Sequence, residues 1–168
     1  LLSPFGGTPA DEDKGRDMIA ELKPDETAHR LTGAVPFLEH HAESTGKVGA
    51  VGFCWGGGMV NRLAVLAPEL KAGVAYYGVQ PPADQVKSIH AALLLHYAGL
   101  DQRVNAGIPA YEAALKAAHK RFEIFVYPNV NHAFNNDTGN RYDKAAAGLA
   151  WGRTLAFLSE YLGPPPKG

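Results

Sequence analysis

The sequence predicts an α/β fold in which a mainly parallel β-sheet is flanked by helices. Short apolar runs alternate along the chain with longer segments that have helical periodicity. Polar and turn residues bound each apolar run, which is typical of strands that are buried on both faces of a sheet. Strands that alternate with helices in this order form parallel sheets with helices on both sides.

Four segments have the strand pattern: residues 47–53, 72–78, 91–99 and 121–128. The segment from 56 to 70 follows the first strand and is predicted to be a helix, with Met59, Leu63 and Leu66 at helical spacing. Residues 107–120 and 142–162 are the other helices of this part, and residues 81–89 form a turn with one helical turn at most.

The chain before the first strand is predicted to hold two helices. Thr8 is the expected N-cap of the first helix, with Pro9 in its first turn and the Asp11 carboxylate nearby. The second begins near Asp25, and Pro36 should kink or break it because proline lacks the N–H that a helix needs.

Composition excludes several classes of function. With 46% hydrophobic and 20% charged residues, the 168-residue chain is of the globular type and large enough for one core. A net charge of −1 gives no basic footprint for nucleic acid, and no apolar run approaches the length of a membrane span. The opening LLSPFGGTPA lacks the basic region of a signal peptide. One cysteine excludes an internal disulfide and a cysteine metal cluster.

Three reactive residues stand just after predicted strands. Cys54 follows the first strand, Asp101 the third and His132 the fourth. In parallel α/β sheets, function gathers at the carboxyl ends of the strands, so these three side chains are expected to meet there.

The stretch Gly52-Phe53-Cys54-Trp55-Gly56 joins a predicted strand to a predicted helix. A nucleophile at such a sharp turn stands clear of the sheet, and the flanking glycines are expected to remove bulk that would collide. The helix that starts at Trp55 adds a positive dipole end, which favours a thiolate, and unpaired N–H groups that can bind an oxyanion. The pattern is therefore the G-x-S-x-G elbow with cysteine in place of serine.

His132 is the expected base for Cys54, and Asp101 is expected to orient the imidazole. The order nucleophile, acid, histidine is that of the α/β-hydrolases. The alternatives are a packing or redox-sensing thiol at Cys54, a loop-surface histidine at 132, and a plain turn or capping residue at 101. His96 is expected to be a core or rim histidine, and no histidine has a metal-ligand spacing with carboxylates.

The segments GFCWGGG, HYAGLDQRV and NHAFNN resemble dienelactone hydrolases (carboxymethylenebutenolidases), which are small α/β-hydrolase-fold enzymes with a Cys-His-Asp triad. The resemblance implies that Cys54 is the nucleophile, Asp101 the acid and His132 the base. It also implies a hydrolase of enol-lactones or activated esters that acts in the breakdown of aromatic compounds. No metal or organic cofactor is expected.

Family domains of this kind have several strands before the loop that matches LLSPFGGTPA. Residues 1–162 are therefore expected to be the C-terminal portion of a single α/β-hydrolase domain, with 163–168 as a flexible tail. A preceding segment of the same protein, or a second copy, is expected to cover the exposed sheet edge. Localisation is expected to be cytoplasmic by default, unless that preceding part carries an export signal. Neither nucleic acid nor a membrane is an expected partner.

The expected mechanism begins with attack of the Cys54 thiolate on an ester or lactone carbonyl, which gives a thioester acyl-enzyme. The Trp55 N–H, with a second donor from the preceding segment, would hold the oxyanion. Tyr77, Phe134 and Arg103 are the expected pocket residues; Arg103 could bind an anionic substrate or simply lie on the surface. The competing hypothesis is a non-catalytic hydrolase-fold protein in which Cys54 is a redox or binding site.

Overall fold

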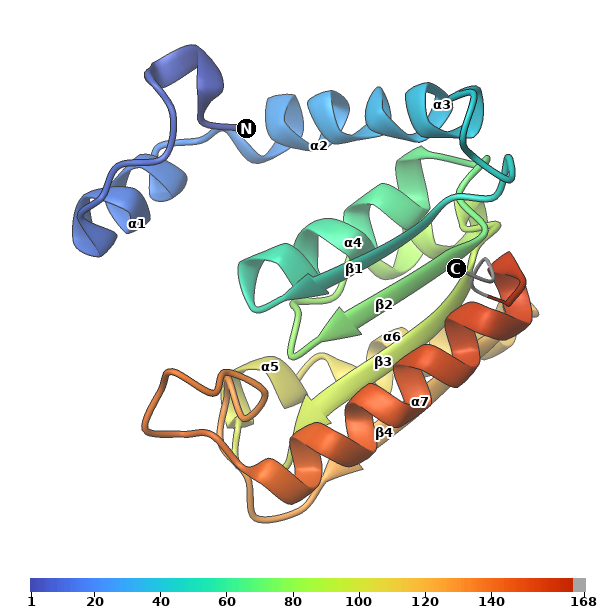
Figure 1. Cartoon of the computed structure of the whole chain (residues 1–168). Coiled ribbons are helices and arrows are strands. Elements are labelled where there is room, and N and C mark those ends of the chain that lie inside the picture. Colours follow the sequence, from blue (N-terminus) through green and yellow to red (C-terminus); the bar gives the residue numbers. More distant parts are fainter. Residues whose placement is uncertain (165–168) are drawn as a thin grey trace.

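A computed structural model of the chain describes residues 1–164 and contains one sheet of four parallel strands (Figure 1). These are β1 (Gly49–Phe53), β2 (Ala72–Tyr76), β3 (Ala92–Ala98) and β4 (Phe122–Tyr127), and they lie side by side in chain order. The predicted strands are confirmed to within two residues at each end. The carboxyl ends of all four strands therefore lie at the same end of the sheet. At this end, β1 is followed by Cys54, β3 by Asp101 and β4 by the loop that carries His132.

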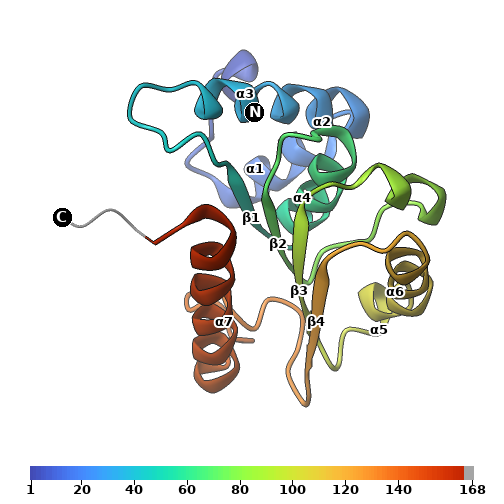
Figure 2. The same ribbon diagram turned by 90° about the vertical axis from the view of Figure 1, so that its right-hand side faces the viewer.

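Helices cover both faces of the sheet, as predicted (Figure 2). The long helix α7 (Lys144–Leu162) lies on one face. On the other face lie α4 (Trp55–Leu66), α5 (Gln102–Asn105) and α6 (Ile108–Ala117). A short 3₁₀ helix, η2 (Ala83–Ser88), occupies the segment predicted as a turn.

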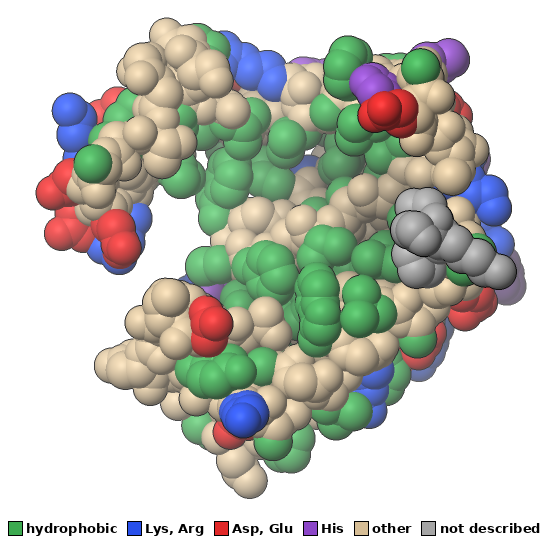
Figure 3. All heavy atoms as spheres, in the orientation of Figure 1, with side chains coloured by type: hydrophobic (Ala, Val, Ile, Leu, Met, Phe, Trp, Pro, Cys, Tyr) green, Lys and Arg blue, Asp and Glu red, His purple; other side chains and the backbone are tan. Residues whose placement is uncertain are grey.

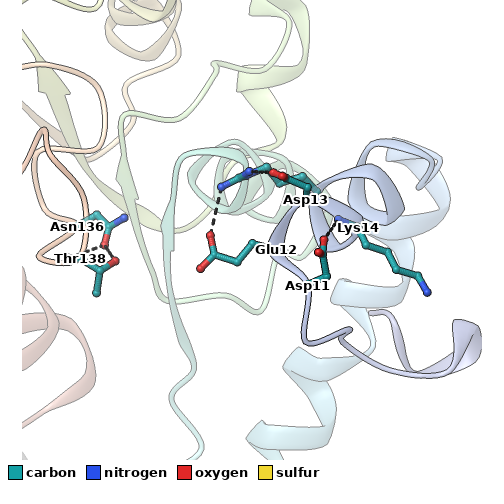
Figure 4. Close-up of polar contacts among 7 residues, drawn as sticks. Asp11, Glu12, Asp13, Lys14, Asn136 and Thr138 are labelled. Carbon is teal, nitrogen blue, oxygen red and sulfur yellow. Dashed lines mark hydrogen bonds and ion pairs between the residues drawn. The ribbon is translucent and has the colours of Figure 1, made fainter.

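The part before β1 holds a 3₁₀ turn, η1 (Ser3–Phe5), and the helices α1 (Glu12–Ala20), α2 (Pro24–Thr32) and α3 (Ala34–Glu39). The prediction that Thr8 caps the first helix is wrong. Asp11 is the N-cap, and its carboxylate accepts a hydrogen bond of 2.8 Å from the Lys14 N–H (Figure 4). A carboxylate satisfies this free N–H and also interacts favourably with the helix dipole, which a threonine hydroxyl does not.

The predicted break near Pro36 is confirmed, and it falls at Gly33, between α2 and α3. In a continuous helix the N–H of residue 36 would bond to the carbonyl of Thr32, and proline has no N–H to give. The helix therefore ends at Thr32, and Pro36 lies inside the first turn of the new helix α3.

Strand β3 lies at the centre of the core, and all seven of its residues are buried. Its side chains alternate between the two faces. Leu93, Leu95 and Tyr97 belong to the core cluster that includes Leu63 of α4 and Leu115 of α6. Leu94 and Ala98 belong to the cluster on the α7 side. Fully burying one leucine side chain contributes about 1.5–3 kcal/mol, so this strand is a large part of the stabilising burial.

His96, also on β3, is a core histidine within a buried hydrogen-bond network. Its Nε2 lies 3.1 Å from Thr154 Oγ1 of α7, and its Nδ1 lies 3.0 Å from the Tyr127 hydroxyl of β4. Thr154 Oγ1 is also 2.7 Å from the Tyr76 hydroxyl of β2. Burial, and then the charge of Arg153, lowers the pKa of His96 to about 3. The ring is therefore neutral, and the network as a whole joins β2, β3 and β4 to α7.

One edge of the sheet is formed by β1, where Val51 and Phe53 are exposed. Figure 3 shows hydrophobic side chains gathered between β1 and α7. Trp151 and Leu155 of α7 are exposed as well. Of the predicted tail, Gly163 and Pro164 follow α7, and residues 165–168 lie outside the described part of the chain. Within residues 1–164, no helix has the length and apolar character needed to cross a membrane.

We predict that His96 makes the fold sensitive to acid. Its pKa of about 3 in the folded protein lies below the ordinary value of 6.5, so between these values the unfolded chain binds a proton that the folded chain does not. Stability therefore falls as the pH drops through this window, by about 1.4 kcal/mol per pH unit for this one group. Urea unfolding of the wild type and of His96→Gln at several pH values measures the slope.

The variant should lose stability at neutral pH but have a shallower acid slope than the wild type. His90→Gln is the matched control, because His90 is exposed on the loop before β3. Equal slopes in the wild type and His96→Gln would contradict the prediction.

Candidate active site

Cys54 lies at the turn between β1 and α4, in a left-handed backbone conformation with φ 56°. Such a conformation is unfavourable for a residue with a side chain, at a cost of about 1–3 kcal/mol, and persists only where the surroundings enforce it. Here the Cys54 N–H donates to the Tyr76 carbonyl at 3.0 Å, and its carbonyl accepts from Gly58 N–H at 3.2 Å. The predicted elbow is therefore present, and the thiol is exposed at its apex.

Close backbone packing of glycines makes this turn possible. A methyl group on Gly52 would overlap the backbone of Gly56, and one on Gly57 would lie 2.7 Å from the Tyr76 carbonyl oxygen. Gly78, after β2, packs against the Gly57 backbone with equally little room. The expectation that Gly56 itself must lack a side chain is wrong, because a methyl there would point into open space. It is the backbone of Gly56 that needs the room left by Gly52.

His132 and Asp101 meet Cys54 at the carboxyl end of the sheet, as predicted. Cys54 Sγ lies 2.9 Å from His132 Nε2, and His132 Nδ1 lies 2.5 Å from Asp101 Oδ2. The Asp101 carboxylate accepts the Nδ1–H, so the Nε2 lone pair faces the thiol. The thiol proton can then move to His132, whose positive charge lies beside the carboxylate.

Asp101 has a second partner that fixes its position. Its Oδ1 accepts a hydrogen bond of 3.2 Å from the Val104 N–H, so the same side chain is the N-cap of α5. The side chain is largely buried, and both of its oxygens are engaged. Helix capping and orientation of the histidine were alternative roles for Asp101 on the sequence alone, and in the structure the side chain has both.

The charges of the site favour the thiolate. The hydrogen bond with His132 is the largest cause that lowers the pKa of Cys54, followed by the charge of His132, the Trp55 N–H and last the charge of Arg103, while partial burial acts in the opposite direction. The pKa of His132 is raised, first by its hydrogen bond with Cys54 and then by Asp101, again against burial. The two shifts together favour a thiolate–imidazolium pair.

Two cavities open at the thiol. The first has a volume of about 400 Å³, and the second about 420 Å³. Cys54 and Tyr77 line both cavities. The first is further lined by Pro24, Trp55, Gly58, Met59, Arg62, Val79, Gln80, Pro81, Pro82, Arg103 and His132. The second is further lined by Phe53, Ala133, Asn135, Asn136 and Asp137.

Three of the predicted pocket and oxyanion residues reach this cleft. Trp55 and Arg103 line the first cavity, and Tyr77 lines both, with its ring centroid 4.9 Å from that of His132. Tyr76 is the partner that faces the core, as the alternation along a strand requires. The second oxyanion donor, expected from a preceding segment, stays a prediction.

The prediction that Phe134 forms part of the pocket wall is wrong. Its side chain is fully buried, and its ring packs behind Tyr77 at 5.5 Å and against Tyr127 at 5.0 Å between centroids. The physical reason is the backbone of Ala133, whose φ of 68° reverses the chain direction after His132. His132 therefore faces the cleft, and Phe134 turns into the core.

Several residues that line the cavities were not predicted from the sequence. Val79 and Gln80 follow β2, and the same rule that found Cys54 could have found them, since they stand after a strand. Asn136 shapes its loop through hydrogen bonds from Thr138 to its side chain oxygen, one of them 2.8 Å long (Figure 4). Pro24 comes from α2, far from the elbow in sequence, and no local pattern indicates its place.

Comparison with known proteins agrees with this fold. The model of the dienelactone hydrolase family matches residues 5–162, so the chain belongs to this family. A "Putative carboxymethylenebutenolidase" of Saccharolobus solfataricus is 39% identical over 113 residues, which are 67% of this chain and 44% of that protein. A protein of the same name from Escherichia coli O157:H7 is 30% identical over 87% of this chain and 58% of its own length. The chain thus spans about half the length of these curated relatives.

Solved structures agree as well. The structure titled as a putative dienelactone hydrolase from Klebsiella pneumoniae has a TM-score of 0.77 and 28% identity, and the match covers 85% of this chain and 64% of that one. A dienelactone hydrolase-like promiscuous phosphotriesterase from metagenomic libraries has a TM-score of 0.74 and 25% identity, over 81% of this chain and 62% of that one. Both matches support the α/β-hydrolase type of fold.

We predict that Gly52→Ala destabilises the protein, because the added methyl group would overlap the Gly56 backbone. Overpacking of this kind typically costs about 1–3 kcal/mol. Urea unfolding measures the effect. Gly148→Ala on α7 is the matched control, since a methyl group there meets open space and alanine is the better helix former. An equal effect of both substitutions would contradict the packing argument.

We predict that His132→Ala moves the alkylation of Cys54 to higher pH. The hydrogen bond to His132 is the main cause of the lowered pKa of Cys54, so its loss leaves less thiolate at neutral pH. Iodoacetamide and intact mass report the rate between about pH 5 and pH 10. The chain has one cysteine, so one adduct reports this site alone. His90→Ala is the control, and an unchanged profile in His132→Ala would count against the pairing.

Proposed function

We propose that this protein hydrolyses activated carboxylic esters or enol-lactones through a thioester intermediate on Cys54. One observation carries the proposal: a cysteine, a histidine and an aspartate from three separate strand ends form a continuous hydrogen-bonded row, with links of 2.9 Å and 2.5 Å. Membership of the dienelactone hydrolase family supports a hydrolase of this class. A Bradyrhizobium relative, 30% identical over 145 residues, bears the name "Probable 2-oxo-3-(5-oxofuran-2-ylidene)propanoate lactonase".

In the acylation step, the Cys54 thiolate adds to the carbonyl carbon, and the carbonyl oxygen becomes an oxyanion. In this mechanism the Trp55 N–H, at the start of α4, donates a hydrogen bond to that oxygen, next to the positive end of the helix dipole. The C–O bond to the leaving group then breaks, and the His132 imidazolium gives its proton to the departing oxygen. The acyl group remains on sulfur as a thioester.

In the deacylation step, His132 takes a proton from water, and the resulting hydroxide attacks the thioester carbonyl. The C–S bond breaks, the carboxylic acid is released, and Cys54 returns as a thiolate beside the protonated histidine. Asp101 holds the imidazole in the required tautomer in both steps. A thiolate is a good nucleophile and also a good leaving group, so the tetrahedral intermediate goes forward most easily when the other group leaves readily as well. The site therefore suits activated esters and enol-lactones better than amides.

The competing proposal is a non-catalytic protein whose Cys54 responds to oxidants or binds a ligand. An exposed thiol with a lowered pKa supports thiol reactivity of either kind. The His132–Asp101 pair favours the hydrolase, because a redox thiol has no need of a base whose second nitrogen is held by a buried carboxylate.

We predict that an activated acetyl ester such as p-nitrophenyl acetate transfers one acetyl group to Cys54 and that the thioester then hydrolyses. Acid quenching followed by intact mass detects the acyl-enzyme. Cys54→Ala should remove the adduct, and His132→Ala should slow turnover by roughly 10³-fold or more, since triad members act as a unit. His90→Ala should match the wild type.

The reference for this experiment is the rate of acylation of the same protein unfolded in urea. If the thiol acylates no faster in the folded protein than in urea, or if the thioester persists without hydrolysis, the hydrolase proposal fails and the reactive-thiol alternative takes its place. Rapid acylation and hydrolysis that both need His132 would exclude a merely reactive thiol.

A further inference from the structure

A third cavity continues the second one away from the thiol. Its volume is about 550 Å³. It shares Phe53, Asn135 and Asp137 with the second cavity, so the two have one wall in common. The third cavity is further lined by Tyr142, Lys144, Ala147, Gly148 and Trp151. Cys54 lines only the second of these two cavities, and residues of α7 line only the third, so the connected space leads from the thiol to the first half of α7.

Three aromatic side chains line the third cavity without being buried. Phe53, Tyr142 and Trp151 are 40%, 41% and 45% exposed. Large apolar side chains that face solvent around one cavity are typical of a binding site rather than of a packed core. Aromatic rings pack well against other rings, with centroids about 4.5–7 Å apart. The group that fits this cavity best is therefore a flat apolar ring.

The surface of α7 leaves room for that ring at Gly148. A methyl group on Gly148 would meet no atom within 4 Å, so the helix is open to the cavity at this point. Lys144 and Trp151 are separated by roughly 10 Å along the helix axis, at about 1.5 Å per residue, which is long enough for a benzene ring with a short chain. The wall carries one cation, Lys144, and one carboxylate, Asp137, so its net charge is zero and it favours an uncharged group.

The loop that joins the two cavities is held closed by its own hydrogen bonds. The Asp143 N–H donates to the Phe134 carbonyl at 2.9 Å, and the Phe134 side chain is buried in the core. The Asn136 side chain accepts hydrogen bonds from Thr138 (Figure 4). The Asn136 carbonyl accepts another, of 3.1 Å, from the Gly139 N–H. These walls are therefore formed before a ligand binds, which lowers the entropic cost of binding.

The place of the histidine indicates which part of a substrate enters this space. His132 lines the first cavity but neither the second nor the third. This inference rests on the proposed function, in which the leaving oxygen takes its proton from His132 and so departs on the side of the first cavity. The acyl group on Cys54 then extends the other way, into the second cavity and towards the third.

We propose that the second and third cavities together bind the acyl arm of the substrate, and that this arm is an uncharged chain that ends in an aromatic ring. The ring lies on the open helix surface at Gly148, in contact with Phe53 and Trp151. The chain passes through the second cavity to the carbonyl at Cys54. The preferred substrates are esters of arylalkanoic acids. Acylation leaves an arylalkanoyl thioester on Cys54, and water then releases the arylalkanoic acid.

The test compares two p-nitrophenyl esters that have the same leaving group and the same unbranched chain at the carbonyl. The ester p-nitrophenyl 5-phenylpentanoate carries the ring, and p-nitrophenyl pentanoate lacks it. The quantity measured is the ratio of kcat/KM for the first ester to kcat/KM for the second. Both esters acylate the same thiol, so a variant that alters only thiol reactivity or the amount of folded protein leaves the ratio unchanged.

The wild type should favour the phenyl ester about tenfold or more, because the ring leaves water and contacts aromatic side chains. Gly148→Leu should remove most of this preference, since the new side chain occupies the place of the ring. Gly148→Ala should lower the ratio less, because a methyl group fills less of the cavity. Trp151→Ala should lower it as well. Leu149→Ala is the matched control, because Leu149 is also exposed on α7 but does not line the cavity, so its ratio should equal that of the wild type.

A second pair of esters places the ring on the leaving side of the scissile bond. These are 4-(4-phenylbutyl)phenyl acetate and 4-butylphenyl acetate, and their ratio should be the same in the wild type and Gly148→Leu. A ratio that depends on Gly148 for this pair and not for the p-nitrophenyl pair would overturn the assignment of the acyl arm.

Two further results would overturn the inference while leaving the proposed function intact. One is a wild-type ratio near one for the p-nitrophenyl pair. The other is an equal ratio in the wild type and Gly148→Leu, as expected if a protein segment rather than a substrate covers the third cavity. Absence of acylation by both p-nitrophenyl esters would overturn the proposed function itself, and this inference with it.

Discussion

The packing of backbone on backbone where β1 ends, α4 begins and β2 ends is the contact on which the site depends. Gly52, Gly57 and Gly78 bring three chain segments closer than any side chain would allow. That approach lets the Cys54 N–H bond to the Tyr76 carbonyl while Cys54 keeps its left-handed conformation. The unfavourable backbone is thus held by the surrounding sheet, and the thiol is fixed before any substrate arrives.

Behind this turn, the buried network of Tyr76, His96, Thr154 and Tyr127 joins the strands to α7 through polar atoms within an otherwise apolar layer. Arg153 donates to the Tyr127 hydroxyl at 3.0 Å and stacks on Phe125, which satisfies the outer end of the network. Buried polar groups that have their partners add rigidity and fix one arrangement of the core. This network therefore makes the strands that carry Cys54, Asp101 and His132 at their ends more rigid.

Much of this arrangement can be predicted from the sequence, because it follows from local patterns. The apolar runs predicted the four strands. Because function gathers at the carboxyl ends of parallel strands, the sequence also predicted that Cys54, Asp101 and His132 meet. Cys54 and His132 are 78 residues apart in the chain, and His132 and Asp101 are 31 residues apart. Predictions were wrong where two nearby residues could each cap the same helix, or where one backbone dihedral angle sets the direction of a side chain. Asp11 caps the first helix in place of Thr8, and Phe134 lies in the core because Ala133 has a left-handed backbone conformation. The place of Pro24 depends on how α2 packs, and no local pattern contains that information.

The walls of the two cavities come from different parts of the chain. The first is assembled from α2, α4, the residues after β2 and α5, whereas most of the second comes from the single loop that follows His132. Substitutions in residues 135–137 can therefore change one wall without disturbing the other, and the shared residues Cys54 and Tyr77 stay constant. Proteins with this arrangement can change the shape of each cavity separately, and with it the part of the bound molecule that the cavity accepts. The reacting residues between the two cavities stay the same.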